Sequence, residues 1–260
     1  MSELVVDGAR IAYRVDGRAD GSPIILINSL GTDLRTWDAQ VDPLGQDLRV
    51  VRFDCRGHGR SGPSPGRVTL ERLGRDVLAL LDHLQVERAH LCGISLGGVV
   101  ALWIAARHAE RVDRAVFANT AAHIGSAESW HARIEAVRAG GMAAVREMVV
   151  ARFLASSFRT RHPATARAIG DMLEDTDPAA YIAACEALAD TDLGSVVASI
   201  EAPSLIIAGA LDEATPVRQA KDLHAAIAGS ELVVLAGASH LSNVECPEEF
   251  TAHVRRFLAA

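Results

Sequence analysis

The sequence predicts an α/β fold in which a mostly parallel, twisted sheet is flanked by helices and a helical cap is inserted after the sixth strand. Short apolar runs alternate with segments of helical spacing up to about residue 120. Helical patterns without a convincing strand then fill residues 121–194, and the alternation resumes with the apolar run at residues 204–208. Alternation of this kind is typical of a parallel sheet covered on both faces.

The predicted strands are short apolar runs bounded by turn residues. The first two, residues 3–6 and 11–15, lie on either side of Asp7-Gly8, a dipeptide that favours a tight hairpin turn. The later runs are separated by longer segments, which parallel strands need for their crossover connections. These strands are expected at residues 23–27, 48–53, 89–92, 112–118, 204–208 and 232–235.

The predicted helices repeat their apolar residues every three or four positions. Residues 69–84 show this spacing most clearly, because leucine and valine recur along one side of the segment. Further helices are expected at residues 96–108, 217–227 and 247–258.

The break in the pattern divides the chain into a core, residues 1–120 and 195–260, and a helical cap, residues 121–194. We expect the cap to lie over the carboxyl edge of the sheet, where open α/β sheets bind ligands. Its first half is rich in arginine and its second half is acidic. Either these are two solvated faces that attract each other, or one or two arginines face inward and bind an anionic substrate. The arginines are Arg133, Arg138, Arg146, Arg152, Arg159, Arg161 and Arg167.

Composition excludes several classes of function. The chain is 49% hydrophobic and 23% charged, a composition typical of globular proteins. Its net charge of −7 disfavours nucleic acid as a partner, because phosphate binding needs a basic surface. No signal peptide and no membrane-spanning run is expected. The four cysteines are far apart and form no CxxC pair, so reduced thiols in a cytoplasmic protein and no metal site are the expectation.

The candidate nucleophile is Ser95. It is the centre of a G-x-S-x-G match at residues 93–97, which follows a predicted strand and opens a predicted helix. This strand–turn–helix context holds a serine in a sharp elbow, where glycines leave room for the tight turn. The alternative is an ordinary glycine turn with an N-capping serine.

A nucleophilic serine needs a base, usually a histidine that is held by an acid. His240 follows the predicted strand at residues 232–235 and precedes the last helix, so its loop can reach Ser95. Among its rivals, His83, His108, His224 and His253 look helical, and His58 precedes the nucleophile in the sequence. Asp212 follows the strand at residues 204–208 and is the predicted acid. Its neighbour Glu213 is the rival, and Asn119 at the end of the sixth strand lacks the charge for this role.

The oxyanion of such a reaction needs two backbone N–H groups. Leu96, directly after the nucleophile, should supply one, and Leu30 in the loop after the third strand should supply the other. Asn28-Ser29 stands in that loop where His-Gly is usual. Asp54, at another strand end, is expected to support the neighbouring turn at residues 56–59.

These residues together resemble the α/β-hydrolase superfamily, and the resemblance to its 3-oxoadipate enol-lactonases covers nearly the whole chain. The loop at residues 26–38 (LINSLGTDLRTWD) and the Ser129-Trp130 region of the cap carry the most specific likeness. Further similar stretches are residues 56–59 with Ser61, 120–122, 124–125, 132–134, 137–141, 208–209 and 214–216. The chain departs at Arg152-Phe153, where these lactonases often have a tryptophan after the arginine.

The resemblance implies an α/β-hydrolase fold, no cofactor and a cytoplasmic enzyme of aromatic breakdown in the β-ketoadipate pathway. Its substrate would be a small anionic lactone. Arg133 would bind the free carboxylate, unless it forms a surface salt bridge to Glu135. Trp130 would form a flat apolar wall, unless it is only a core aromatic of the cap. A homo-oligomer is compatible with the sequence.

Other functions stay open at this point. The cap could serve a general carboxylesterase or a C–C bond hydrolase of ring-cleavage products. A non-catalytic receptor on the same fold is a further alternative. A haloalkane dehalogenase is disfavoured, because it needs an aspartate where Ser95 stands.

Overall fold

The computed structural model describes residues 1–63 and 65–260, and within them eight strands form one sheet in the order β1-β2-β4-β3-β5-β6-β7-β8. The strands β1 and β2 pair antiparallel, as do β2 and β4, and every later pair is parallel. The predicted mostly parallel sheet is therefore confirmed. The strands are β1 (Ser2–Val6), β2 (Ala9–Gly17), β3 (Ser22–Ile27), β4 (Leu48–Phe53), β5 (Ala89–Ile94), β6 (Val112–Ala118), β7 (Ser204–Gly209) and β8 (Glu231–Leu235).

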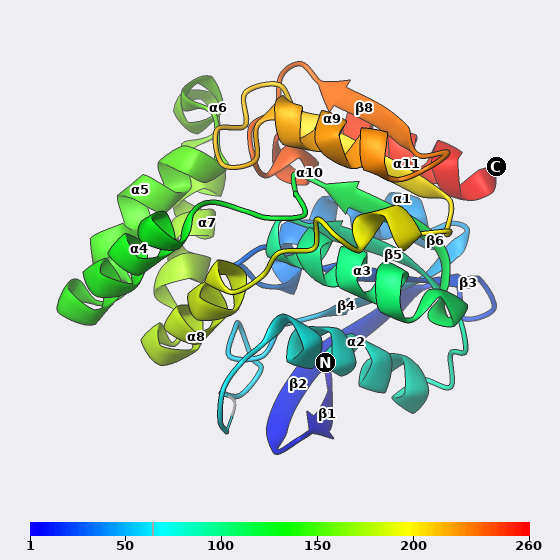
Figure 1. The fold of residues 1–260 in the computed structure, drawn as a ribbon, viewed down its shortest axis with the longest axis horizontal. Coiled ribbons are helices and arrows are strands. Elements are labelled where there is room, and N and C mark those ends of the chain that lie inside the picture. Colours follow the sequence, from blue (N-terminus) through cyan, green and yellow to red (C-terminus); the bar gives the residue numbers. More distant parts are fainter. Residues whose placement is uncertain (64) are drawn as a thin grey trace.

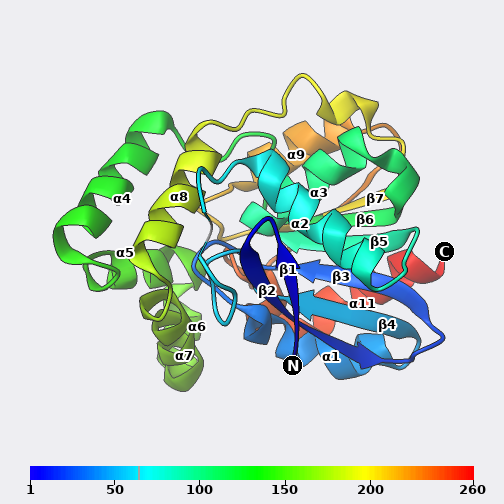
Figure 2. The ribbon, with the colours of Figure 1, turned by 90° about the horizontal axis from the view of Figure 1, so that it is seen from below.

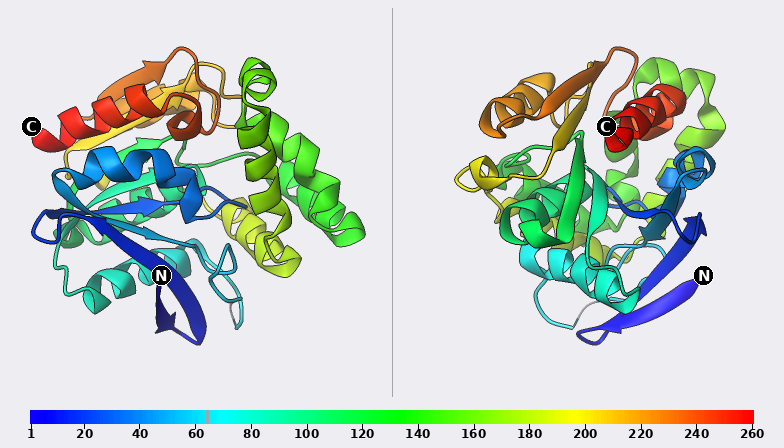
Figure 3. Two further views of the ribbon diagram at one scale, coloured as in Figure 1. Left: turned by 180° about the vertical axis from the view of Figure 1, so that it is seen from behind. Right: turned by 90° about the vertical axis from the view of Figure 1, so that its right-hand side faces the viewer.

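Helices cover both faces of this sheet (Figure 2). Helices α2, α3 and α9 pack on one face, and α1 and α11 lie together on the other. Figure 3 shows the second face from behind, with α11 beside α1. The helices are η1 (Leu34–Trp37), α1 (Asp38–Gly45), α2 (Leu70–His83), α3 (Leu96–Arg107), η2 (Ala109–Arg111), α4 (Ala127–Gly140), α5 (Ala143–Phe153), α6 (Ser156–Arg161), α7 (Pro163–Glu174), α8 (Pro178–Ala189), η3 (Val197–Ser199), α9 (Val217–Ala226), α10 (Ser242–Glu245) and α11 (Pro247–Ala259).

The core forms because the central strands are apolar on both sides. All six residues of β5 and all six of β7 are buried, as a parallel strand between two helical layers requires. On the second face, the rings of Trp37 and Phe250 meet at 6.1 Å and join η1 to α11. Burying each such side chain stabilises the fold by about 2–3 kcal/mol.

Helices α4 to α8 follow β6 and precede β7, within the segment predicted to form the cap. They lie beside the sheet at the end toward which β3 and β4 point, seen at the left of Figures 1 and 2. Helix α4 packs on α5 and α8, and α5 packs on α7. This arrangement places cap residues opposite the loops that leave the carboxyl ends of the strands. The boundaries of the division at residues 120 and 195 stay a prediction.

One segment differs from the sequence prediction, which placed no helix between the third and fourth strands. The structure has η1 and α1 there. The pattern was weak because the segment is short, contains Pro43 and has little apolar periodicity. The Asp33 side chain caps η1 by accepting from the Arg35 N–H at 2.9 Å.

Candidate active site

Ser95 lies at the turn between β5 and α3, with φ 56° and ψ −118°. A non-glycine residue rarely has a positive φ, so this backbone is strained and must be held by its neighbours. The Ser95 N–H donates to the Ala118 carbonyl at 3.0 Å, and the Ser95 carbonyl accepts from Thr120 Oγ1 at 2.9 Å. The start of the segment after β6 therefore fixes the turn from both sides.

The glycines of the G-x-S-x-G stretch are required by close backbone contacts. A Cβ on Gly93 would lie 2.1 Å from the Gly97 carbonyl oxygen, and a Cβ on Gly97 would lie 2.1 Å from the Ile27 oxygen. No side chain fits at either distance. The two glycines thus let the turn close on itself and let α3 approach the end of β3.

His240 and Asp212 meet at the carboxyl edge of the sheet. His240 Nδ1 lies 2.9 Å from Asp212 Oδ2, and both side chains are buried. A carboxylate only accepts, so this contact puts the ring proton on Nδ1 and leaves Nε2 free as a base. The rival Glu213 is exposed to solvent.

Asp212 is held as a carboxylate by several donors. Burial alone would raise its pKa, but His240 and hydrogen bonds from Thr215 and Asn119 lower the pKa to about 2. The Thr215 hydroxyl donates to Oδ2 at 2.7 Å and its N–H donates to Oδ1 at 3.0 Å. The side chain is therefore charged at neutral pH and is oriented by its neighbours.

Asn119 has a part that the sequence reasoning missed. Its side-chain amide donates to Asp212 Oδ2 at 2.9 Å and to the Ser239 carbonyl at 3.0 Å, and its own oxygen accepts from Ser242 Oγ at 2.5 Å. Asn119 thus ties the acid to the loop that carries His240. The available signal was its place at the end of β6, next to the elbow.

The loop after β3 approaches the elbow from the other side. Leu30 lines the cavity in front of Ser95, and Leu96 is the first residue of α3. In the described residues, no hydrogen bond engages the backbone N–H of Leu30 or Leu96. The Asn28 amide donates to the Phe53 carbonyl at 2.8 Å and so fixes the loop to β4.

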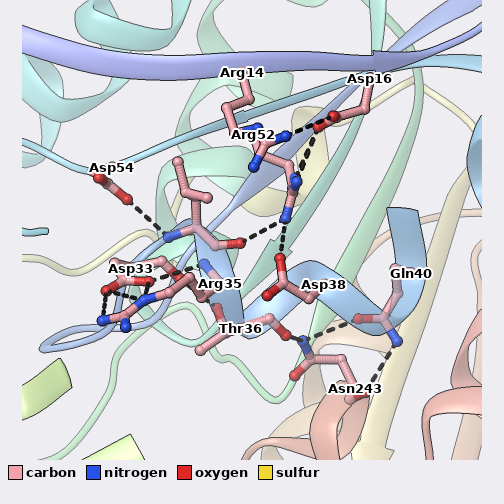
Figure 4. A network of polar contacts seen from close by, with 11 residues as sticks. Arg14, Asp16, Asp33, Arg35, Thr36, Asp38, Gln40, Arg52, Asp54 and Asn243 are labelled. Carbon is pink, nitrogen blue, oxygen red and sulfur yellow. Dashed lines mark hydrogen bonds and ion pairs between the residues drawn. The ribbon is translucent and has the colours of Figure 1, made fainter. Parts of the chain in front are cut away.

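A polar network holds this loop in place (Figure 4). Asp54 accepts from the Leu34 N–H at 2.8 Å. It also accepts from the Arg60 N–H at 2.9 Å. Asp54 therefore supports the loop after β3 as well as the turn that the sequence analysis assigned to it. Asn243 Nδ2 donates to the Thr36 carbonyl at 2.8 Å. This last contact joins the loop to the segment that follows His240.

A cavity lies between the sheet edge and the cap. It brings together Ser95 and His240 from the core with Trp130 and Arg133 from α4. Further lining residues are Leu30, Ile124, Gly125, Ser129, Val149, Arg152, Phe153 and Ala214. The structure thus places polar reactive groups at one end of a largely apolar enclosure, which is the usual form of a small-molecule site.

Trp130 and Arg133 act as a pair within this cavity. The Arg133 guanidinium lies 4.9 Å from the centre of the Trp130 ring, a cation–π contact. The indole N–H donates to the Ile124 carbonyl at 2.7 Å, and the ring is 6% exposed. Trp130 is therefore both a core residue of the cap and part of the cavity wall. Glu135 pairs with Arg138 at 2.7 Å, so it is not the partner of Arg133.

The cap arginines divide into two groups. Arg146 pairs with Asp171 at 2.9 Å and also with Glu174, which joins the basic and acidic halves of the cap as solvated faces. Arg133 and Arg152 line the cavity, and neither forms an ion pair with a carboxylate of the described residues. Arg146 therefore fits the interpretation as a solvated face. Arg133 and Arg152 face the cavity, and their binding of an anionic substrate stays a prediction.

Phe153, the expected departure from the lactonase resemblance, stacks on His240 with ring centres 5.4 Å apart. Its carbonyl accepts from the Leu241 N–H at 2.9 Å. The end of α5 is thus in direct contact with the loop of the histidine. Sequence reasoning noted Phe153 only as a departure and could not place it.

Two features concern other kinds of site. Across the described part of the chain, no group of three or more His, Cys, Asp or Glu side chains is arranged to hold a metal ion. Within the same residues, no helix has the length and apolar character needed to cross a bilayer.

Comparisons with known proteins agree with this geometry. Residues 22–247 match the family model of the alpha/beta hydrolase fold. Two 3-oxoadipate enol-lactonases of Acinetobacter baylyi are 38% and 40% identical to the chain, covering 95% and 94% of it and 92% and 91% of the relatives. The chain belongs to the enol-lactonase family of α/β hydrolases. The crystal structure of the enol-lactonase from Burkholderia xenovorans LB400 superimposes on this hydrolase with a TM-score of 0.98 and 41% identity, over 100% of both chains.

Proposed function

We propose that this α/β hydrolase converts 3-oxoadipate enol-lactone to 3-oxoadipate through a Ser95–His240–Asp212 triad. The observation that carries the proposal is that Ser95, His240 and Arg133 line one cavity. An ester that carries a free carboxylate fits this arrangement: Ser95 and His240 would act on the ester, and Arg133, which pairs with no carboxylate of the described residues, would bind the carboxylate. Membership of the enol-lactonase family supports the lactone, and with it a place in aromatic breakdown through the β-ketoadipate pathway.

In the first half-reaction, Ser95 Oγ attacks the ring carbonyl while His240 Nε2 takes the hydroxyl proton. Asp212 stabilises the imidazolium that forms. The N–H groups of Leu30 and Leu96 would receive the negative charge on the carbonyl oxygen. The ring C–O bond then breaks and His240 returns its proton to the enol oxygen, which remains on the same acyl chain.

In the second half-reaction, His240 takes a proton from water, and the water oxygen attacks the acyl carbon. The bond to Ser95 Oγ breaks, Ser95 recovers its proton, and the enol rearranges to the ketone of 3-oxoadipate. Arg133, supported by the face of Trp130, would hold the carboxylate that the lactone already carries.

The proposal is tested by turnover of enzymatically generated 3-oxoadipate enol-lactone, followed by loss of its absorbance, beside turnover of p-nitrophenyl acetate. We expect kcat/KM for the lactone to exceed that for the neutral ester. Arg133→Gln should lower the lactone value by about 10- to 100-fold, the worth of a hydrogen bond to a charged group, and change the acetate value by less than about threefold. Acetate turnover without lactone turnover would mean that the cap serves another ester.

A further inference from the structure

Arg152 is a second cation at the catalytic cavity, separate from Arg133. It lies at the end of α5, one residue before the Phe153 ring that stacks on His240. Its backbone carbonyl accepts from Ser239 Oγ at 3.4 Å, so this part of α5 touches the histidine loop. Arg133 lies on α4, where its guanidinium contacts Met148 Sδ at 3.9 Å. The two guanidinium groups therefore approach the cavity from different helices, with Arg152 on the histidine side.

Arg152 forms no ion pair with a carboxylate of the described residues. Burial, and then the like charge of Arg133, lower its pKa, while Asp212 and Glu213 act in the opposite direction. Among the described residues, Asp212 forms no ion pair with Arg152, and its oxygens accept from His240, Thr215, Asn119 and backbone N–H groups instead. Glu213 is exposed and forms no ion pair with Arg152. A half-buried, unpaired guanidinium costs stability, and a bound anion would recover that cost.

Tyr181 adds an unsatisfied donor near the two arginines. Its ring is fully buried against Gly31, where an added Cβ would lie 3.0 Å from the ring. Its hydroxyl has no hydrogen bond of normal geometry with any described residue. Burial raises the pKa of Tyr181 to about 12, against the opposing effect of Arg133 and Arg152. The phenol is therefore neutral and keeps a proton that it can donate to an oxygen anion.

We propose that Arg152 is a second carboxylate-binding residue of this cavity, and that the cavity binds short dicarboxylates more tightly than monocarboxylates of the same length. This inference rests on the proposed function, in which Arg133 holds the carboxylate that the substrate brings. Hydrolysis converts the ester carbonyl at Ser95 into a second carboxylate on the histidine side, where Arg152 stands. The product is then a dianion that faces two cations.

Calorimetric titration with adipate and hexanoate tests this inference, because the two acids have the same length and differ in one carboxylate. We expect wild type to bind adipate about 10- to 100-fold more tightly than hexanoate. In Arg152→Gln this ratio should fall by about tenfold or more, and Arg152→Lys should recover part of it. Arg159→Gln is the matched control, since Arg159 lies outside the catalytic cavity and should keep the wild-type ratio.

Thermal unfolding of the same proteins gives a second measurement. Free Arg152→Gln should melt at or above the wild-type temperature, because an uncompensated charge is removed, and adipate should stabilise it less than wild type. An unchanged adipate preference in Arg152→Gln, or equal binding of the two acids to wild type, would overturn the inference. Binding is measured without turnover, so the two proposals can fail separately. If the wild type does not turn over the lactone but still prefers adipate through Arg152, the proposed function is contradicted and the inference about Arg152 is supported.

Discussion

The backbone of Ser95 is strained, and this strain places its side chain at the sharp turn between β5 and α3. The positive φ costs on the order of 1–3 kcal/mol and persists only because the surrounding contacts determine it. Gly93 and Gly97 remove the side chains that would block the turn, and Thr120 and Ala118 bind its backbone. A strain that is held from several sides is characteristic of a functional turn.

Asp212→Asn should show how the Asp212 carboxylate orients His240 without disturbing the packing of the site, because the two side chains have nearly the same shape. The amide presents an N–H to His240 or favours the wrong tautomer, so we expect kcat to fall by about 10³- to 10⁴-fold with little change in KM. Kinetics with p-nitrophenyl acetate measure this. Glu213→Gln, which removes the neighbouring exposed carboxylate, is the control and should stay near wild type. Activity of Asp212→Asn within tenfold of wild type would contradict the assignment of the acid.

Much of the candidate site could be predicted from local sequence context, because Ser95, Asp212 and His240 each follow a recognisable strand. Asn119 was dismissed as an uncharged alternative to the acid, although it binds that acid directly. Asn119 contacts Asp212 and Ser239, which are 93 and 120 positions away in the sequence, and no local pattern encodes such pairings. Arg152 was one of seven cap arginines, and only the packing of α5 shows that it lines the cavity.

At the scale of elements, the end of α5 and the loop of His240 are bound to each other by Glu245. One carboxylate oxygen accepts from the Ala155 N–H at 2.8 Å, just after α5, and the other accepts from the Ser239 N–H at 2.5 Å. Burial raises the pKa of Glu245, while these two N–H groups oppose the rise. Together with the stacking of Phe153 on His240, this carboxylate couples the end of α5 to the loop of His240.

Glu245→Gln should weaken that coupling. The amide keeps one acceptor but turns its NH₂ group toward the second N–H, so one charge-assisted hydrogen bond is lost, worth about 1.5–3 kcal/mol. We expect a lower melting temperature and a fall in kcat of about tenfold, with KM nearly unchanged, because His240 is less well oriented. Glu248→Gln, an exposed carboxylate on the following helix, serves as the control. A variant with wild-type kcat would show that Glu245 acts only on stability.

Most elements of the core were predictable because their apolar periods are regular, with η1 and α1 as the exceptions, and Asp7-Gly8 correctly predicted the hairpin. Both residues of that turn have a positive φ. The helices of the cap were predictable only as a class. Helix α5, for example, buries Val145, Val149 and Val150 on one face, but its exposed side carries alanines and Met148, which weakens the contrast between the two faces in the sequence. Its ends, and therefore the position of Phe153, depend on contacts with other elements.

At the scale of the whole molecule, the strand order gathers the site. Strands β5, β6 and β7 are neighbours, so the residues after them meet at one edge, although Ser95 and Asp212 are more than one hundred positions apart in the sequence. The loop after β8 adds His240, and the network of Figure 4 adds the loop after β3. The cap covers these residues and supplies Trp130 and Arg133 to the same cavity.

Acid stability of the molecule should depend on Asp212. Its pKa is about 2 in the folded chain against a usual 3.8, so the charged form contributes about 2 kcal/mol above pH 4. This contribution is lost as the pH falls from about 4 toward 2. Urea unfolding of wild type and Asp212→Asn between pH 2 and 6 measures it. We expect the difference in unfolding free energy to change in favour of the variant as the pH falls, and a difference that is constant across this range would contradict the depressed pKa.

The most direct test of the account is kcat/KM for 3-oxoadipate enol-lactone, measured with wild type and with Ser95→Ala under the same conditions. Ser95→Ala removes one buried hydroxyl and should leave the fold intact. We expect the variant to lose a factor of about 10³ or more, by analogy with other removals of a triad nucleophile. Lactone turnover by Ser95→Ala within tenfold of wild type would contradict the nucleophile and the mechanism built on it.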